Sequence, residues 1–273
     1  MKTNHNGYWG PFGLLNELET KLIIDQFGNF SDRLLPWLKG RHTVNPLIAE
    51  IACHPIIVEQ LKAILGDDVL LSGCQIIKQA PQKNLSWHVD LEHAQWEGLS
   101  VWVALENVIP GKSMSLIARS QNFGATPEDF KLQGKDLSSP GKVLDLAKEL
   151  DPEATLVELH ITDGQFFIFD GKLWHATQNP SDSPRYALLL QYCRPDQKVK
   201  AVLDINYPQI RFHSFKPECL LISGSDQYGV NRVITRKQVG TPVRKVKAAL
   251  WYAPRTIAYK ALRKVRRRFL RWS

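Results

Sequence analysis

From residue 69 to residue 193 the chain is a succession of short segments rich in β-branched and aromatic residues, separated by Pro, Gly, Asn and Asp. Segments of this kind are typical of strands. Several short strands at this spacing predict an all-β sandwich or barrel rather than alternating strand–helix units. We expect strands at Val69–Lys78, Leu85–Leu91, Leu99–Asn107, Met114–Ala118, Thr155–Ile161, Gln165–Phe169, Trp174–Thr177 and Tyr186–Cys193.

Two helices are expected ahead of the strands, and one interruption is expected among them. Apolar residues recur at helical spacing up to Gly28 and again over residues 55–65, and we expect both segments to be support helices. Residues 121–152, rich in Gly, Ser, Asp and Lys, interrupt the strands. We expect either a lid over a functional site or a surface excursion with a short helix at 143–149. Beyond the strands, only a turn at residues 224–229 is indicated.

The composition is that of a globular chain. Its 273 residues are 44% hydrophobic, enough to bury a full core. The sequence has no apolar run of roughly 18 residues and no secretory signal at its N-terminus, so we expect a cytoplasmic protein. The four cysteines, Cys53, Cys74, Cys193 and Cys219, form no C-x-x-C pair. They indicate buried free thiols rather than a zinc knuckle or a disulfide framework.

The formal net charge of +8 is concentrated at the C-terminal end. Residues 236–273 hold 13 Lys and Arg and no Asp or Glu, which leaves 22 basic against 27 acidic residues in 1–235. We therefore expect a single, mildly acidic domain over residues 1–235, with a strand-rich core at about 69–195. A basic tail over residues 236–273 follows it.

The basic tail carries an apolar stripe at helical spacing. The stripe consists of Ala258, Leu262, Val265, Phe269 and Trp272. Such an amphipathic helix fits an anionic membrane surface, contacted through residues 255–273, which would make the protein peripheral to a membrane. The alternatives are a helix docked on the body of the chain or a solvated tail. Binding to nucleic acid is not favoured, because no recognised binding motif accompanies the basic cluster.

The segment Ser86-Trp-His-Val-Asp90 carries the first signal of chemistry. Successive side chains of a strand point to opposite faces, so His88 and Asp90 project to the same side. One strand thus brings a nitrogen and a carboxylate oxygen to a single point. An H-x-D triplet alone is weak evidence, because it also occurs at solvated strand edges.

A second histidine strengthens that signal. After Asp163 a turn leads into an apolar strand, an Asp-Gly turn follows, and His175 lies just beyond it. Two histidines and one carboxylate form the facial triad that leaves three positions open on iron(II), as oxygen chemistry requires. A structural zinc would be closed by four ligands. His88, Asp90 and His175 are therefore the candidate metal-ligating and catalytic residues.

An arginine begins the last apolar strand, ten residues after His175. Burying a guanidinium without an anionic partner is costly, so Arg185 is expected to face an anion. Its planar group suits bidentate binding of a carboxylate. The alternative is a strand-end arginine whose head reaches solvent.

In their order, these segments resemble the phytanoyl-CoA dioxygenase family of iron(II) and 2-oxoglutarate oxygenases. The matching positions are Trp87-His88-Val89-Asp90, Trp102 on its strand, Asp163-Gly164, His175, Asn179-Pro-Ser181 and Arg185. The resemblance covers about residues 70–195. Where the family usually has P-G-S-H, this chain has Ala118-Arg119-Ser120-Gln121. The resemblance therefore implies no substrate-side contacts for this turn.

The resemblance implies a double-stranded β-helix, or jelly-roll, core in which the three candidate ligands bind iron(II). It implies that Arg185 pairs with the distal carboxylate of 2-oxoglutarate. Thr177 and Trp102 would line the cosubstrate pocket, although Trp102 can equally be a core aromatic. The implied activity is hydroxylation of a small organic or lipid-like substrate with O2, releasing succinate and CO2.

Other interpretations stay open at this point. His93 could replace one ligand, and His160 is expected to lie in the core or behind the ligands. Gln75 or Lys78 could line the pocket. A different class of answer is a non-catalytic jelly-roll binding protein, or a metal-dependent hydrolase or isomerase that uses the same two histidines and aspartate. Arg185 argues against both, because it calls for a carboxylate cosubstrate.

Overall fold

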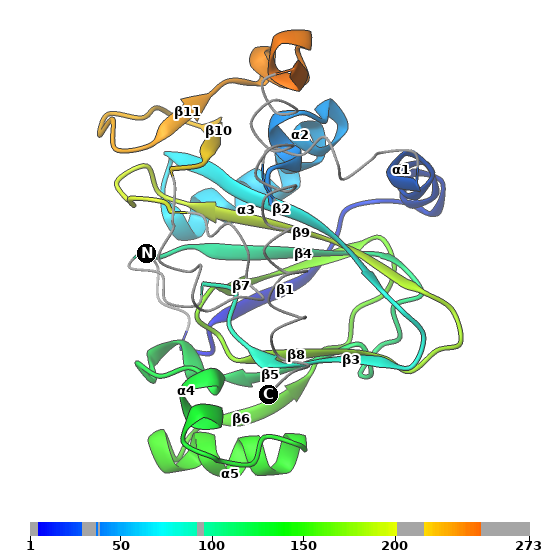
Figure 1. Cartoon of the computed structure of the whole chain (residues 1–273), viewed down its shortest axis with the longest axis vertical. Coiled ribbons are helices and arrows are strands. Elements are labelled where there is room, and N and C mark those ends of the chain that lie inside the picture. Colours follow the sequence, from blue (N-terminus) through cyan, green and yellow to red (C-terminus); the bar gives the residue numbers. More distant parts are fainter. Residues whose placement is uncertain (1–4, 29–36, 38, 92–95, 201–215, 247–273) are drawn as a thin grey trace, which may run out of the picture.

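The computed structural model describes residues 5–28, 37, 39–91, 96–200 and 216–246. Two β-sheets face each other, and helices cover their outer faces (Figure 1). The larger sheet has seven strands in the order β1-β7-β4-β9-β2-β10-β11, and the smaller has four in the order β3-β8-β5-β6. The strands are β1 (Tyr8–Gly13), β2 (Val69–Gln79), β3 (Lys83–His88), β4 (Leu99–Glu106), β5 (Met114–Ala118), β6 (Thr155–Glu158), β7 (Gln165–Asp170), β8 (His175–Asn179), β9 (Arg185–Cys193), β10 (Glu218–Ser223) and β11 (Arg232–Ile234).

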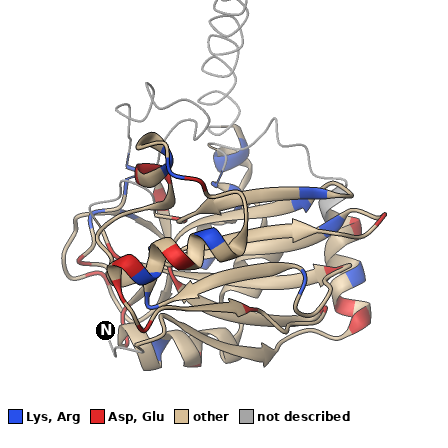
Figure 2. Cartoon of the chain, turned by 90° about the horizontal axis from the view of Figure 1, so that it is seen from below, with Lys and Arg blue, Asp and Glu red and all other residues tan. Residues whose placement is uncertain are grey.

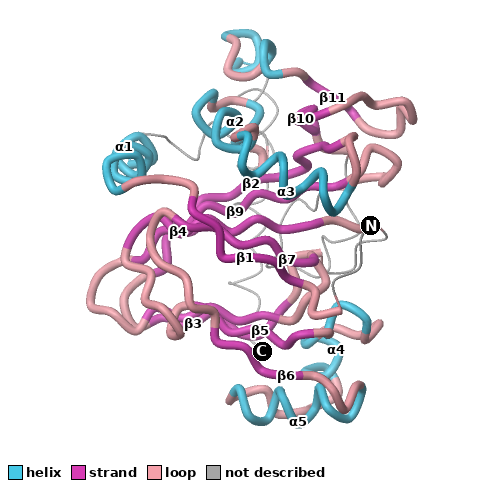
Figure 3. The backbone as a smooth tube through the Cα atoms, turned by 180° about the vertical axis from the view of Figure 1, so that it is seen from behind, coloured by secondary structure: helices cyan, strands magenta, loops and turns pink. Residues whose placement is uncertain are grey.

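The expected jelly-roll fold is confirmed. From β2 to β5 and again from β7 to β9, successive strands alternate between the two sheets, which Figure 3 shows from behind. All neighbouring strands run antiparallel except β10 and β11. The interior between the sheets is filled by apolar side chains from both of them. These include Trp102, Ala104, Met114, Leu116, Phe167, Phe169, Ala187 and Leu189.

The N-terminal helices cover the outer face of the seven-stranded sheet, which confirms their supporting role. They are α1 (Glu17–Gly28), α2 (Pro46–Ala52) and α3 (Pro55–Leu65). Helix α3 begins at a proline, ends before Gly66 with φ +95°, and buries one apolar stripe on the sheet. Helix α2 is capped by Asn45, whose side chain accepts from the backbone of Leu47 and Ile48.

The interruption at residues 121–152 forms two helices, α4 (Pro127–Leu132) and α5 (Pro140–Leu150). They pack on the outer face of the four-stranded sheet, where Val143 and Leu146 join a buried cluster with Trp87 and Trp174 (Figure 1). The segment therefore supports the smaller sheet from outside, as in the surface-excursion alternative, and does not form a lid over the interior. The helix is longer than the one expected at 143–149.

The chain after Pro195 extends the larger sheet, which was not expected from the sequence. Strands β10 and β11 add to it beyond β2. Residues between 236 and 246 also contact the body. Val239 is buried with the core beneath the helices, and the Gly240 amide donates to the Thr43 carbonyl. The predicted membrane-binding helix at 255–273 lies outside the described residues.

Three of the four cysteines are buried, Cys53 is half-buried, and all four are free thiols, as expected. None of the helices among the described residues combines the length and the apolar character needed to cross a bilayer. Acidic and basic residues are interspersed over the helices and loops of the described body (Figure 2), in line with its small net charge.

Candidate functional site

The three candidate metal ligands converge on the interior side of the four-stranded sheet. His88 ends β3 and His175 begins β8, and the two are direct cross-strand partners whose ring centroids lie 4.2 Å apart. Asp90 Oδ1 lies 3.8 Å from His175 Nε2. One ligand atom from each residue falls within 4.8 Å of the others, so the three side chains can hold a metal ion.

The convergence follows from strand geometry, although β3 is shorter than expected. The strand was expected to run through Leu91 but ends at His88. The alternation of side chains nevertheless continues: Trp87 and Val89 face the helices outside, and His88 and Asp90 face inward. A bond from the Leu91 amide to the Gly171 carbonyl ties this end to the turn that precedes His175.

Both histidines present the same ring nitrogen to the metal position. The Nδ1 atom of His88 lies 2.9 Å from the Ser86 carbonyl, and that of His175 lies 2.9 Å from the Leu173 carbonyl. A carbonyl can only accept, so each Nδ1 carries the proton and each Nε2 offers a lone pair. Asp90 is oriented similarly, because its Oδ2 accepts from the Ser100 hydroxyl and its Oδ1 faces His175.

The electrostatics of the site favour the protonation states that bind metals. Burial, with a smaller contribution from the neighbouring His175, lowers the pKa of His88 to about 4, so this imidazole is neutral near pH 7. Burial by itself would raise the pKa of Asp90. The neighbouring side chains, first His175 and then Lys39, together with the hydrogen bond from Ser100, outweigh burial and hold that pKa below its ordinary value.

Arg185 lies in the interior with no solvent exposure. Its Nη1 donates to the carbonyls of Ser113, at 2.6 Å, and Gln178, at 3.1 Å, and its Nη2 donates to the Gln79 side chain. These acceptors are all neutral, and no carboxylate among the described residues pairs with it. Burial accordingly lowers the pKa of Arg185 to about 10.

Trp102 and Thr177 both belong to the surroundings of Arg185. The guanidinium lies 5.2 Å from the centroid of the Trp102 ring. Thr177 faces inward two residues after His175 and donates to Gln79 Oε1 at 3.2 Å. Trp102 is also part of the buried interior cluster, so it is both a core aromatic and a neighbour of the arginine.

The Asn179-Pro-Ser181 segment is the support of this arginine. Asn179 is fully buried, and its Nδ2 donates to the carbonyls of Gln79, Ala80 and Ser183. These bonds tie the end of β2 to the turn between β8 and β9. The turn therefore sets where β9 begins and hence where Arg185 enters the interior.

Sequence reasoning missed Gln79, which links Thr177 to Arg185. Strand β2 was expected to end at Lys78, one residue too early. Side chains alternate between the two faces of β2, so the register that places Ile77 in the interior also places Gln75 and Gln79 there. This alternation is the sequence signal that could have identified Gln79. Lys78 points the other way, to the outer face, where its Nζ lies 5.3 Å over the Tyr186 ring. Of the two residues left open as pocket residues, Gln75 therefore lies on the interior face and Lys78 does not.

Of the two other histidines considered from the sequence, only His160 lies among the described residues. His160 was expected in the core or behind the ligands, and it is exposed beside Gly111 instead. The chain leaves its strand after Glu158, so the alternation that would have buried His160 no longer applies. His93 lies outside the described residues.

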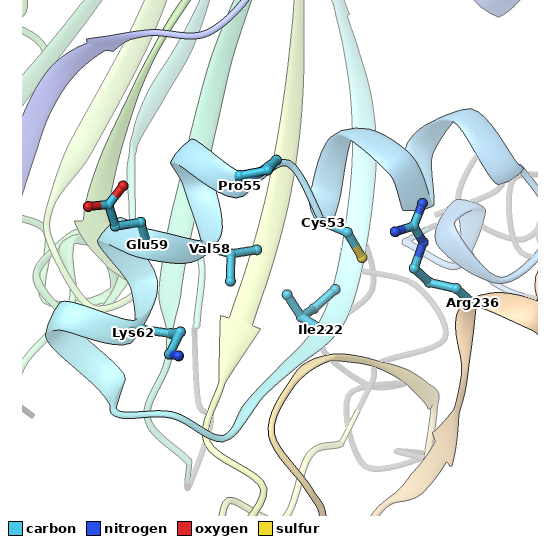
Figure 4. A pocket seen from close by; sticks show the side chains of 7 residues that line it. All are labelled: Cys53, Pro55, Val58, Glu59, Lys62, Ile222 and Arg236. Atoms are coloured by element: carbon cyan, nitrogen blue, oxygen red, sulfur yellow. The ribbon is translucent and has the colours of Figure 1, made fainter.

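A surface pocket lies on the helix-covered side of the larger sheet, away from the triad. Figure 4 shows its lining. The residues are Cys53, Pro55, Val58, Glu59, Lys62, Ile222 and Arg236. Burial raises the pKa of the Cys53 thiol, so this cysteine is not an activated nucleophile. The lining contains none of the three candidate metal ligands, so this pocket is not the candidate metal site.

Comparison with known sequences identifies one family. Residues 23–187, more than half of the chain, match the model of the phytanoyl-CoA dioxygenase family. The match includes His88, Asp90, His175 and Arg185. A comparison with curated proteins gave no significant match.

Comparison with solved structures shows the same fold in several proteins. ThoJ, described as a non-heme monooxygenase, is 18% identical with a TM-score of 0.61, over 92% of this chain and 97% of ThoJ. CytC3 with Fe(II) and alpha-ketoglutarate is 18% identical with a TM-score of 0.57, over 84% and 89%. EctD from S. alaskensis, with 2-oxoglutarate and 5-hydroxyectoine, is 17% identical with a TM-score of 0.56, over 85% and 84%.

Proposed function

This chain belongs to the phytanoyl-CoA dioxygenase family, and on that premise we propose that it is an oxygenase dependent on iron(II) and 2-oxoglutarate. His88, Asp90 and His175 hold the iron. Arg185, Thr177 and Trp102 bind the cosubstrate. The substrate is a small organic or lipid-like molecule, which the enzyme hydroxylates.

The donor set fits iron(II). Two imidazole nitrogens and one carboxylate oxygen occupy one side of a metal ion and leave positions open for a chelating cosubstrate and for O2. The bonds from Nδ1 to backbone carbonyls and from Ser100 to Asp90 orient all three ligands. Such pre-set ligands lower the cost of assembling the site.

The observation that supports 2-oxoglutarate as the cosubstrate is a buried arginine with no anionic partner among the described residues. Arg185 has 0% exposure, only neutral acceptors, and an Nε with no hydrogen-bond partner among the described residues. The indole Nε1 of Trp102 beside it is also buried and unpartnered within that part of the chain. Buried donors of this kind are expensive unless a ligand satisfies them. The distal carboxylate of 2-oxoglutarate supplies both the charge and the acceptors.

The residues of the chain have separate tasks in this proposal. Bound iron(II) with 2-oxoglutarate and O2 supplies the oxidising chemistry, which yields succinate and CO2 and transfers an oxygen atom to the substrate. Arg185 and Thr177 fix the orientation of the cosubstrate, and Gln79 holds those two side chains in register. Phe169, whose ring lies 4.9 Å from that of His175, helps to exclude water from the ligands.

Neither of the two competing functions accounts for both the metal triad and the buried arginine. A hydrolase or isomerase using the same triad has no use for a buried guanidinium at a second position. A non-catalytic binding protein has no use for two histidines that both present Nε2 to one point. An oxygenase that takes a dicarboxylate cosubstrate uses both features.

The test is the dependence of succinate formation on each component. The purified chain should convert 2-oxoglutarate to succinate when iron(II) and O2 are both supplied, and His88→Ala, Asp90→Ala and His175→Ala should abolish both this turnover and iron binding. His160→Ala is the matched control, because His160 is an exposed histidine outside the site. Full turnover and iron affinity in all three ligand variants would refute the assignment. Activity with zinc in the absence of O2 would favour the hydrolase.

A further inference from the structure

A second cationic position lies at the other end of β9. The interior face of this strand carries Arg185, Ala187, Leu189 and Gln191, with the arginine at its start. Gln191 is six residues further on, or about 20 Å along an extended strand. The Nζ of Lys39 donates to Gln191 Oε1 at 3.0 Å. The interior is therefore flanked by one cation at each end of the strand.

Lys39 reaches this position because its backbone lies beside β2. The Lys39 carbonyl accepts from the Cys74 amide at 2.8 Å, and Gly40 forms a bridge with Cys74. Gly73 leaves the space for the lysine stem. A Cβ atom at Gly73 would lie 3.3 Å from the Lys39 Cβ, which is tighter than most real contacts, and 3.4 Å from Gln191 Oε1.

This pair adjoins the metal centre on the side of Asp90. Gln191 is the cross-strand partner of Ser100, and Ser100 is the residue whose hydroxyl donates to Asp90 Oδ2. The charge of Lys39 also acts on the pKa values of both His88 and Asp90, which it lowers. Arg185, in contrast, is bound to residues on the side of Thr177.

Gln191 holds an unmet hydrogen-bonding requirement. Its side chain is 5% exposed, and its Oε1 is used by Lys39. Its Nε2 is buried with no partner among the described residues. The bond from Lys39 also fixes the amide orientation, since an ammonium cannot donate to an NH2 group. An amide N–H and an ammonium side by side match the two oxygens of a carboxylate.

We propose that Lys39 and Gln191 bind a carboxylate group of the primary substrate, so that the enzyme acts on a carboxylic acid. This inference rests on the proposed function, because it takes the triad as the place of reaction. Two different carboxylates are then bound in the interior, one from 2-oxoglutarate at Arg185 and one from the substrate at Lys39. Their separation along β9 keeps the cosubstrate and the substrate from exchanging places.

The experiment measures binding of paired probes to the holoprotein. Protein loaded with iron(II) and 2-oxoglutarate under anaerobic conditions is titrated calorimetrically with straight-chain, aromatic and N-acyl amino carboxylates. Each acid is compared with its own primary amide and with the phosphate ester of the matching alcohol. The variants are Lys39→Met, which keeps the stem without the charge, and Gln191→Glu, which keeps the bond from Lys39 but replaces the donor by an anion. Lys78→Met, from the outer face of β2, is the matched control.

At least one acid should bind the wild type on the order of tenfold or more tightly than its amide, as loss of a charge-assisted contact implies. Lys39→Met and Gln191→Glu should each remove that preference while 2-oxoglutarate affinity stays within about twofold, and Lys78→Met should retain it. The proposal is overturned if no acid is preferred to its amide, if phosphate esters are preferred to acids, or if Lys39→Met weakens 2-oxoglutarate binding instead. Wild-type protein that binds neither iron(II) nor 2-oxoglutarate would refute the proposed function itself, which separates the two failures.

Discussion

The guanidinium of Arg185 lies over the indole ring of Trp102, and each of these two buried side chains retains a nitrogen with no hydrogen-bond partner among the described residues. This contact leaves two N–H groups without an acceptor in that part of the chain, the Nε of Arg185 and the Nε1 of Trp102. These N–H groups define where an anionic acceptor would sit. They also make the empty site less stable than the filled one, because buried donors without acceptors cost free energy.

Replacement of Arg185 by methionine should therefore weaken 2-oxoglutarate binding by about a hundredfold, since a charge-assisted pair is worth roughly 1.5–3 kcal/mol for each bond. Iron(II) affinity should stay close to that of the wild type. In thermal unfolding, 2-oxoglutarate should raise the Tm of the iron-loaded wild type and not that of the variant. Arg232→Met, at an exposed arginine of β11, is the control. Unchanged 2-oxoglutarate affinity in Arg185→Met would show that another group binds the cosubstrate.

Asn179→Ala should weaken the proposed 2-oxoglutarate pocket indirectly, because Asn179 supports the turn before Arg185. The change removes the donor to three backbone carbonyls in a fully buried position, and we expect a loss of about 2–3 kcal/mol in the free energy of unfolding. It should also raise the Kd for 2-oxoglutarate, because the start of β9 is no longer held.

Ser181→Ala in the same turn is the control for Asn179→Ala. Ser181 is half-buried and its hydroxyl bonds only within the turn, so we expect less than about 1 kcal/mol. Urea unfolding followed by calorimetric titration measures both effects. A variant Asn179→Ala that is destabilised but binds 2-oxoglutarate normally would limit Asn179 to a purely structural role.

The strands that were predictable from sequence are those whose pattern is local. All eight expected strands are present, because alternation or continuous apolar character within each segment encoded them. Strand β1, with the sequence YWGPFG, contains residues that disfavour strands, and its pairing with β7 overrides that preference. Strands β10 and β11 are short members added at the edge of the sheet.

The residues of the candidate site also divide into those with a local sequence pattern and those without one. His88 and Asp90 could be paired from sequence because alternation holds even beyond the end of β3. Gln79 depended on the end of a strand, which is the least certain feature of any such prediction. Lys39 reaches the interior only through the approach of its segment to Gly73, a contact between distant parts of the chain that no local pattern encodes.

The buried His42 should make stability depend on pH. Its ring is fully buried, with Nε2 2.9 Å from the Glu218 carbonyl, and burial lowers its pKa from 6.5 to about 4. Between these two pH values the unfolded chain binds a proton that the folded protein does not, so stability is complete above pH 6.5 and falls as the pH drops towards 4. The loss attributable to this residue is about 3 kcal/mol.

His42→Gln keeps a donor for the Glu218 carbonyl but cannot titrate in this range. The variant should therefore lose less stability than the wild type between pH 7 and pH 5, whatever its absolute stability at pH 7. Urea unfolding of metal-loaded protein at both pH values gives the comparison, and the metal suppresses titration of the triad histidines. Equal pH slopes in the two proteins would mean that His42 is not the source of acid sensitivity.

The tail prediction has to be tested with a break later than the one at residue 235. Residues 236–246 belong with the body, because Val239 is in the buried core and Arg244 pairs with Glu218. A chain ending at residue 246 should keep its fold and its iron(II)- and 2-oxoglutarate-dependent turnover. A chain ending at 235 lacks Val239 and exposes the part of the core that this side chain covers, so it should be less stable.

The full chain, with its stripe of apolar residues and its cations between 255 and 273, should sediment with vesicles that contain anionic lipid. Salt should release much of it, since charge attraction is screened within about 10 Å at 0.1 M, and the apolar stripe should retain the remainder. The chain ending at 246 should stay in the supernatant with anionic vesicles and with neutral vesicles alike. Binding to neutral vesicles as strong as to anionic ones would show that the cations play no part. A full chain that ignores anionic vesicles at low salt would leave a helix docked on the body, or a solvated tail, as the role of this segment.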